Sequence, residues 1–199
     1  MKLSIVTTLY GSAAHINEFY ERSLLVAREL AGEEFEIIFV NDGSPDNSLE
    51  IGLSLMEQDE KIKIIDLSRN FGHHKAMMLG LEHAQGKLIF LIDIDLEEQP
   101  EWLISFNSLM LSENADVVYG VQASRKGNFF ERISGYFFYR LFRFFTKLDQ
   151  ANNLTTARLM SRRYVQALIS HREREINIGG LWVITGFKQC HHEVTKLST

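Results

Sequence analysis

The chain has 199 residues and a net charge of −5 at pH 7; 45% of its residues are hydrophobic and 24% are charged. This is the composition of a globular protein of one domain, and the acidic balance gives no indication of nucleic-acid binding. Its one cysteine, Cys190, excludes an intrachain disulfide and fits a reducing compartment, and we expect neither a signal peptide nor a transmembrane helix.

The first 121 residues alternate between strand and helix patterns. Strands are predicted at residues 3–9, 35–40, 61–67, 88–92 and 116–121. Helices are predicted at residues 13–30, closed by Gly32, at 45–58, with Ser44 as N-cap and Pro45 at the first helical position, at 73–84 and at 100–111. This alternation predicts βαβ units and therefore an α/β fold, in which helices flank a mainly parallel sheet.

The remaining residues have a different character. Residues 129–145 are dense in aromatic side chains with interleaved arginines. This pattern is typical either of an interfacial helix at a membrane surface or of a helix that covers the sheet while its arginines reach solvent. A short strand is predicted at 157–160 and a helix at 161–169 with Ser161 as N-cap, whereas 183–187 suits an edge strand or a helix end. The β-like residues 188–199 stop without a closing element, so we expect a chain truncated at its C-terminus.

The apolar strand at 88–92 leads directly into acidic residues. Asp93, Asp95 and Glu97 alternate, so in extended chain their carboxylates would point the same way. Mg²⁺ and Mn²⁺ take oxygen ligands, often one or two carboxylates plus substrate phosphates, and ligands of open α/β sheets bind at the carboxyl ends of strands. The pattern therefore predicts a divalent-cation site; the alternative is an acidic loop that caps the next helix.

Other motifs are absent or poorly spaced. No Gly-x-Gly-x-x-Gly follows the first strand, and residues 80–87 lack the spacing of a phosphate-binding P-loop. The adjacent pair His73 and His74 is unsuited to chelating one zinc ion, and we interpret both as surface or phosphate-proximal residues.

Five stretches in order resemble the family-2 inverting glycosyltransferases of the GT-A fold. They are VNDGSPD (40–46), SRNFGH (68–73), DIDLEEQPE (93–101), VYGV (118–121) and RLMSRR (158–163). The set is most similar to the branch of polyprenyl-phosphate sugar transferases, which includes the dolichyl-phosphate mannosyltransferase-like enzymes. The resemblance covers roughly residues 3–188 and implies a nucleotide-diphosphate sugar as donor, with a UDP-sugar favoured.

The resemblance also implies where the sugar nucleotide would bind. Asp42 would contact the base or ribose; the alternative is a turn residue in the Asn-Asp-Gly-Ser-Pro sequence. Thr8 and Tyr10 would flank the base. Three cations are candidates for gripping the phosphates, and each could instead be an ordinary surface residue: Arg69, Lys75 and Arg125.

For the acidic stretch, the resemblance implies a metal site with Mg²⁺ or Mn²⁺. Asp93 would lie near the ribose and the metal, and Asp95 would bind the metal directly and serve catalysis. Glu97 stands where relatives usually carry Gln, and its extra charge should tighten cation binding.

The catalytic base is less clear from the sequence. Relatives in the polyprenyl-phosphate branch often carry an Asp two residues before the RLMS stretch, where this chain has Thr156. A lipid phosphate is already ionised and needs no base, whereas a sugar hydroxyl would need one. Glu173 is the candidate base in that case, with an ion-paired helix residue as its alternative role. Arg158, the first residue of the RLMS stretch, is included among the catalytic candidates.

We therefore predict a single GT-A domain over residues 1–199, with a nucleotide-sugar half at 1–121 and an acceptor or membrane-proximal half at 122–199. The predicted activity is metal-dependent, inverting sugar transfer to a polyprenyl phosphate or lipid-linked glycan, by a cytoplasmic protein bound peripherally at the inner membrane face. Homo-oligomers are possible and no nucleic-acid partner is expected. The alternatives are transfer to a soluble or polysaccharide hydroxyl and a non-catalytic membrane-docking module.

Overall fold

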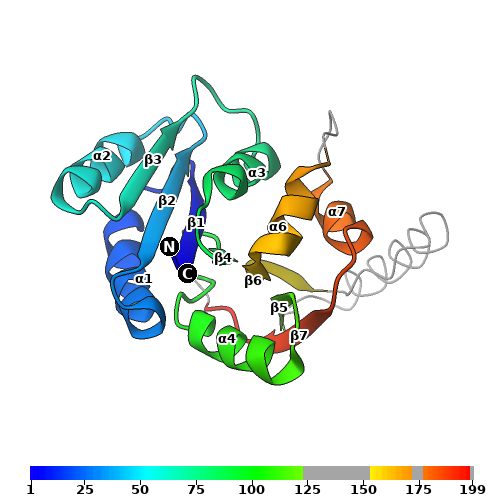
Figure 1. Ribbon diagram of the computed structural model, residues 1–199. Helices are drawn as coiled ribbons and strands as arrows, with labels where there is room; N and C mark the ends of the chain where they lie inside the picture. Colours follow the sequence, from blue (N-terminus) through cyan, green and yellow to red (C-terminus); the bar gives the residue numbers. More distant parts are fainter. Residues whose placement is uncertain (123–152, 172–176, 198–199) are drawn as a thin grey trace.

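The computed structural model describes residues 1–122, 153–171 and 177–197 (Figure 1). In chain order the elements are β1 (Leu3–Leu9), α1 (Ile16–Ala31), β2 (Phe35–Asn41), α2 (Ser48–Gln58), β3 (Ile62–Asp66), α3 (His73–His83), β4 (Leu88–Leu91), α4 (Trp102–Glu113), β5 (Val117–Gln122), β6 (Leu154–Ser161), α6 (Arg162–Ile169), α7 (Ile178–Ile184) and β7 (Gln189–Val194).

The strands form one seven-stranded sheet in the order β3-β2-β1-β4-β6-β5-β7. All neighbouring pairs are parallel except the two that involve β6, which runs antiparallel to β4 and to β5. The α/β fold with a mainly parallel sheet is therefore confirmed. The predicted strand at 157–160 was too short, because β6 spans eight residues and pairs on both sides.

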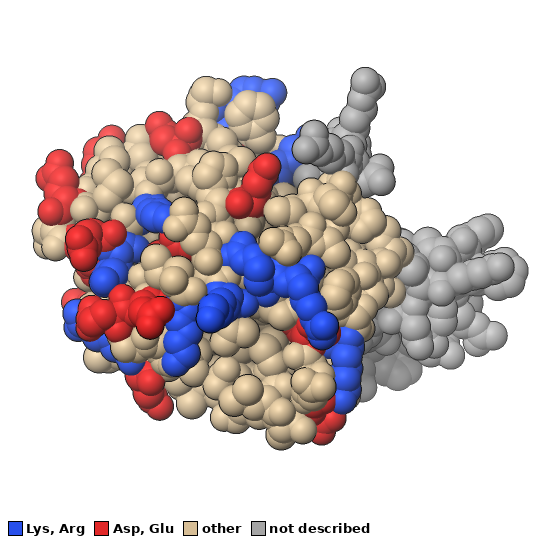
Figure 2. Space-filling model, viewed as in Figure 1, with Lys and Arg blue, Asp and Glu red and all other residues tan. Residues whose placement is uncertain are grey.

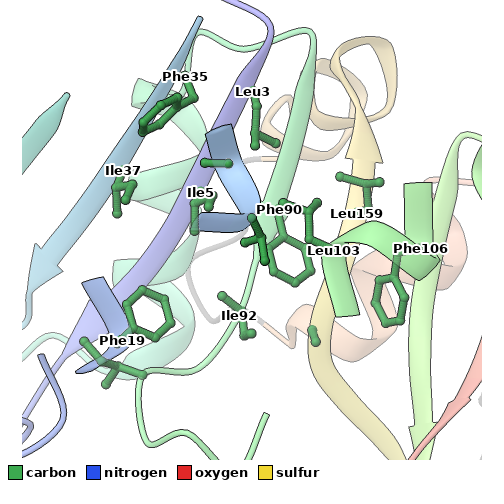
Figure 3. Packing of buried hydrophobic residues seen from close by; sticks show 14 of the residues in the cluster. Leu3, Ile5, Phe19, Phe35, Ile37, Phe90, Ile92, Leu103, Phe106 and Leu159 are labelled. Atoms are coloured by element: carbon green, nitrogen blue, oxygen red, sulfur yellow. The ribbon is translucent and has the colours of Figure 1, made fainter. Parts of the chain in front are cut away.

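Helices cover both faces of this sheet (Figure 1). On one face α1, α2 and α4 pack against an apolar cluster that includes Phe19, Phe90 and Phe106, with the rings of Phe90 and Phe106 packed edge to face (Figure 3). On the other face α3, α6 and α7 pack over a second apolar cluster, which includes Met77 and Tyr164. Both β1 and β2 are buried along their whole length, as expected for central strands of a two-sided sheet.

Several element ends agree with the sequence pattern, whereas the starts of α1, α2 and α4 lie two or three residues later than predicted. Gly32 ends α1 with a φ of 62°, and the Ser161 side chain accepts a hydrogen bond from the Tyr164 N–H at the start of α6. The predicted start of α2 is wrong: the helix begins at Ser48 rather than at Pro45. The Asp46 carboxylate accepts from the Ser44 and Ser48 hydroxyls and from the Ser48 N–H, so the residues before α2 form a separate turn.

The last part of the chain resolves one open alternative. Residues 183–184 are the end of α7, and a turn then leads into β7, which pairs in parallel with β5 at the sheet edge. The aromatic stretch 129–145 lies outside the described residues. Among the described helices, none is long and apolar enough to cross a membrane.

Charge is unevenly distributed over the molecule. Lys and Arg side chains run across the middle of the face drawn in Figure 2, while Asp and Glu gather mainly on the side of α1 and α2. Three cations donate to carbonyls at helix C-terminal ends: Lys2 to Leu30, Arg162 to Ala84, and Lys188 to Glu113. These contacts place positive charge at the negative C-terminal ends of the helix dipoles, where it is stabilising. The three cations therefore have a structural role.

A buried carboxylate ties the parallel half of the sheet together. Glu36 in β2 is only 1% exposed. It accepts hydrogen bonds from the Ser4 hydroxyl and from the Gln85 N–H, and it forms an ion pair with Lys63 of β3. Burial alone would raise the pKa of Glu36, but these three partners outweigh it and hold the pKa below its ordinary value.

Glu36→Gln should lower the free energy of unfolding at pH 7 by about 1–3 kcal/mol, because the amide loses the negative charge that pairs with Lys63 and replaces one acceptor oxygen with an NH₂ donor. Since the folded pKa of Glu36 is depressed, its carboxylate stabilises the fold above the unfolded pKa of about 4.3, and this contribution is lost as pH falls through the folded pKa. Urea unfolding should therefore show a mutant deficit that shrinks below about pH 4.

The control for this prediction is Glu34→Gln. Glu34 is the residue immediately before β2, and its side chain is 74% exposed. We expect a change within about 0.5 kcal/mol at any of these pH values. A Glu36→Gln deficit that grew as pH fell would contradict the assignment.

Candidate functional site

A cavity lies where the order of the strands reverses. From β1 the chain proceeds outward through β2 and β3, and then returns to place β4 on the other side of β1. Such switch points are where open α/β sheets bind ligands, at the carboxyl ends of the strands. The cavity has a volume of about 290 Å³ and is lined by residues after β1, after β4 and at the start of α3: Thr8, Tyr10, Ser12, His73, Asp93, Ile94 and Asp95.

Three of the lining side chains are in direct contact. His73, the first residue of α3, places Nδ1 2.9 Å from the Thr8 hydroxyl and Nε2 3.3 Å from Asp93 Oδ1. The Asp93 carboxylate raises the pKa of His73. Burial would raise the pKa of Asp93, but the His73 and Thr156 side chains outweigh it and lower that pKa. The contact joins β1, α3 and the end of β4 into one wall.

The acidic turn, residues 93–98, is not an extended chain. β4 ends at Leu91, Leu96 has a left-handed φ of 63°, and the Glu97 N–H donates to the Asp95 carboxylate at 3.0 Å. The expectation that three alternating carboxylates point the same way is therefore wrong. Glu97 instead lies 3.5 Å from the ammonium of Lys196, and its role as a metal ligand stays a prediction.

The two aspartates nevertheless suit a cation. Asp93 Oδ1 is buried, and its nearest partner is His73 Nε2 at 3.3 Å, a long contact that leaves this oxygen weakly paired. Burial, followed by the charges of Asp93 and Glu97, raises the pKa of Asp95. Within residues 1–122, 153–171 and 177–197, no three His, Cys, Asp or Glu side chains converge as a metal cage. A cation here would take one or two protein ligands and fill the rest from substrate and water, as Mg²⁺ commonly does.

Asp42 lies beside this cavity rather than in its wall. It is 2% exposed, and its carboxylate accepts from the N–H groups of Phe71 at 2.7 Å and Gly72 at 3.0 Å. These bonds hold the loop after β3, where the Arg69 guanidinium lies 4.1 Å from the centroid of the Phe71 ring. A contact between Asp42 and a nucleotide remains a prediction; what the structure gives Asp42 is a loop-positioning role.

Arg158 is the most deeply buried cation in the described structure. It is 1% exposed in β6, its guanidinium carbon lies 2.9 Å from the centroid of the Trp182 ring, and it donates to the carbonyls of Thr155 and Thr156. Burial lowers its pKa to about 9. The cavity wall does not include it, so its predicted catalytic role has no contact in support.

The remaining predicted residues divide into two groups. Lys75 lies in the first turn of α3, near but not in the cavity wall. Arg125 and Glu173 lie outside the described residues. Sequence reasoning did not assign Glu98 or Lys196 to the site. It left His73 as either a surface or a phosphate-proximal residue, and the structure places His73 in the cavity wall.

A close backbone approach underlies the loop that Asp42 holds. Gly43 has a φ of 63°, and a Cβ there would lie 2.5 Å from Arg69 C and Asn70 N. Gly43→Ala should therefore destabilise the protein beyond the roughly 1–2 kcal/mol expected for a left-handed alanine. Gly11 has an almost equal φ of 64° but open space around its Cβ position.

Gly11→Ala is accordingly the matched control, since it carries the backbone strain without the clash. Urea unfolding of both variants should show a clearly larger loss for Gly43→Ala. Equal losses of stability in the two variants would mean that Gly43 does not approach the backbone of Arg69 and Asn70 closely.

Comparison with known proteins places this arrangement in a family. The family model described as glycosyl transferase family 2 matches residues 4–169. A protein of Mycobacterium tuberculosis (strain CDC 1551 / Oshkosh) that carries a glycosyltransferase name is 47% identical over 196 residues, covering 98% of this chain and 57% of that protein. The undecaprenyl-phosphate 4-deoxy-4-formamido-L-arabinose transferase of Shewanella sediminis (strain HAW-EB3) is 31% identical, covering 86% of this chain and 52% of that enzyme.

Among solved structures, the mannosyltransferase PcManGT from Pyrobaculum calidifontis, in complex with GDP-Man and Mn²⁺, is similar with a TM-score of 0.66 at 14% identity. The match covers 96% of this chain and 55% of that one, and it shows a shared fold. This chain thus spans between half and three fifths of the length of these proteins. With a family model that matches most of its length, the chain belongs to glycosyl transferase family 2.

Proposed function

We propose that this chain carries the sugar-donor site of a metal-dependent, inverting glycosyltransferase that uses a nucleotide-diphosphate sugar. The observation that carries the proposal is the pair of aspartates in the switch-point cavity. Asp93 and Asp95 both line the cavity, Asp93 Oδ1 is buried with His73 Nε2 3.3 Å away, and burial raises the pKa of Asp95. Two partly buried carboxylates held side by side at a strand end favour a bound divalent cation.

In this proposal Asp95 and Asp93 hold Mg²⁺ or Mn²⁺, which when bound would neutralise the charge of the departing diphosphate. The contacts of His73 with Thr8 and Asp93 hold in place the cavity wall that would lie beside the departing diphosphate. Tyr10 is 56% exposed at the cavity rim and offers an aromatic face for stacking of a base. The Mn²⁺ and GDP-Man bound by the structural neighbour PcManGT are consistent with this reading.

For the acceptor we propose a polyprenyl phosphate. Thr156, at the position where the polyprenyl-phosphate branch often has Asp, directs its side chain to Asp93 and its N–H to Glu98. No base is required there if the acceptor is a phosphate, whose second pKa is about 6. A relative at 31% identity is named for transfer to undecaprenyl phosphate. Peripheral binding at the inner membrane face belongs to the same proposal.

Transfer to a sugar hydroxyl is the runner-up. It requires a base, and the candidate for that role, Glu173, lies outside the described residues. The two acceptors are separated by assaying sugar transfer to short-chain polyprenyl phosphates and to oligosaccharides in parallel.

The donor site is tested by calorimetric titration with a panel of nucleoside diphosphates and their sugars, with and without Mn²⁺. One nucleotide should bind in a metal-dependent way. Asp95→Asn should weaken that binding by at least about tenfold, the lower end of the loss caused by removing even an outer partner of a metal.

The matched control is Asp66→Asn. Asp66 ends β3 at the same edge of the sheet but lies outside the cavity wall, so its variant loses one carboxylate charge without touching the site. If both variants weakened binding equally, the loss would come from the change in net charge rather than from a lost metal ligand. Full metal-dependent binding by Asp95→Asn would overturn the metal assignment.

A further inference from the structure

The acidic turn ends in a buried carboxylate that does not line the cavity. Glu98 is 0% exposed, although glutamate is rarely buried without partners. Its two oxygens accept from the backbone N–H groups of Thr156 at 2.9 Å and Ala157 at 2.7 Å, both in β6. Glu98 is outside the cavity wall, so these bonds serve the structure of the turn rather than contact with a ligand.

The two N–H groups need this partner because the neighbouring strand stops short. β4 ends at Leu91, which pairs with Arg158, so Ala157 and Thr156 extend beyond it. On the other side of β6, the register with β5 shifts between Tyr119 and Val121. Buried backbone N–H groups require acceptors, and the Glu98 carboxylate takes the place that a further residue of β4 would have taken.

A second contact reaches the same turn from the far end of the chain. The Lys196 ammonium, two residues after β7, lies 3.1 Å from Glu98 Oε1 and 3.5 Å from Glu97 Oε2. The Leu197 N–H donates to the Glu97 carbonyl at 3.0 Å. Lys196 is 23% exposed, so this ion pair is largely shielded from solvent, where the loss of one partner leaves a buried charge uncompensated.

We propose that Glu98 and Lys196 are positioning residues that clamp the acidic turn between β6 and the segment after β7. The clamp, defined as these two side chains, fixes Asp93 and Asp95 at the cavity without touching the sugar nucleotide. This inference rests on the proposed function for its consequence, metal-dependent nucleotide binding. The clamp itself concerns this chain's own contacts and is measurable without any ligand.

A purely electrostatic role for Lys196 makes the opposite prediction. An ammonium beside four carboxylates lowers the negative potential that attracts a divalent cation. If Lys196 acted only as a counter-charge, Lys196→Met would strengthen Mn²⁺-dependent binding. If Lys196 acts through the clamp, the same variant frees the turn and weakens that binding, by about tenfold as for other outer partners of metal sites.

The first measurement is amide hydrogen exchange of metal-free wild type, Lys196→Met and Lys196→Arg. In Lys196→Met the amides of Thr156 and Ala157 should exchange about tenfold faster while those of β1 remain unchanged, because opening is local. Lys196→Arg retains a cation that can reach both glutamates and should restore slow exchange. The control is Lys188→Met, which removes the lysine just before β7, paired with Glu113 in an exposed contact, and should leave the turn unaffected.

The second measurement is binding of UDP and GDP with Mn²⁺ to the same variants and to Glu98→Gln, which keeps the volume but places an amide NH₂ against one backbone N–H. Both Lys196→Met and Glu98→Gln should weaken binding about tenfold. Unchanged exchange in Lys196→Met would overturn the clamp, as would tighter or unchanged nucleotide binding despite faster exchange. If wild type bound neither nucleotide while the exchange result held, the donor-site proposal would fail and the clamp contacts would stand.

Discussion

The structure depends on how several carboxylates are accommodated at the end of one buried strand. β4 is apolar and covered on both faces, so its exit delivers the acidic turn to the edge of the sheet. Burial, followed by the like charges of Asp93 and Glu97, disfavours ionisation of Asp95 and therefore raises its pKa. His73 partners Asp93, and Lys196 partners Glu97. A further positive charge beside Asp95 would stabilise its carboxylate, and for this reason we propose that the cavity binds a cation.

The parts of the fold around the turn serve that arrangement from three directions. The reversal of strand order brings the end of β1 against the end of β4. Asp42 holds the loop after β3, which leads into α3 and so places His73. The antiparallel strand β6 extends past β4 and offers N–H groups to Glu98. Loss of any one contact would leave the aspartates present but imprecisely held, which metal sites tolerate poorly.

The sequence predicts local features of this fold well. β1 is predicted at residues 3–9 and is found there, because its β-rich stretch is followed directly by a turn that contains Gly11. Ser161 was expected to cap α6 and does so. Thr8 and Tyr10, which the family resemblance places beside the base, line one cavity with Asp93 and Asp95, while the roles of these four residues stay predictions. The first two features rest on short-range pattern, and the grouping of the four residues rests on the resemblance and on the rule that strand ends meet at one sheet edge.

Features set by distant contacts were beyond the sequence. The direction and length of β6 depend on pairing with strands far away along the chain, and the left-handed Leu96 that breaks the extended acidic stretch has no propensity signal. Lys196 lies after the last strand, in a polar stretch that carries no motif, so nothing in the sequence indicates that it pairs with the acidic turn. The α2 start was misjudged because Asp46, rather than Ser44, organises that turn.

The central claim is that the aspartates between β1 and β4 hold a divalent cation for a nucleotide diphosphate. The most direct measurement is an anomalous-scattering map from crystals grown with Mn²⁺ and the nucleoside diphosphate that binds best. Our account predicts one manganese peak within coordination distance of Asp95, next to density for a diphosphate in the cavity that Thr8, Tyr10 and His73 line. A nucleotide bound elsewhere, or a diphosphate in the cavity with manganese remote from Asp95, would contradict it.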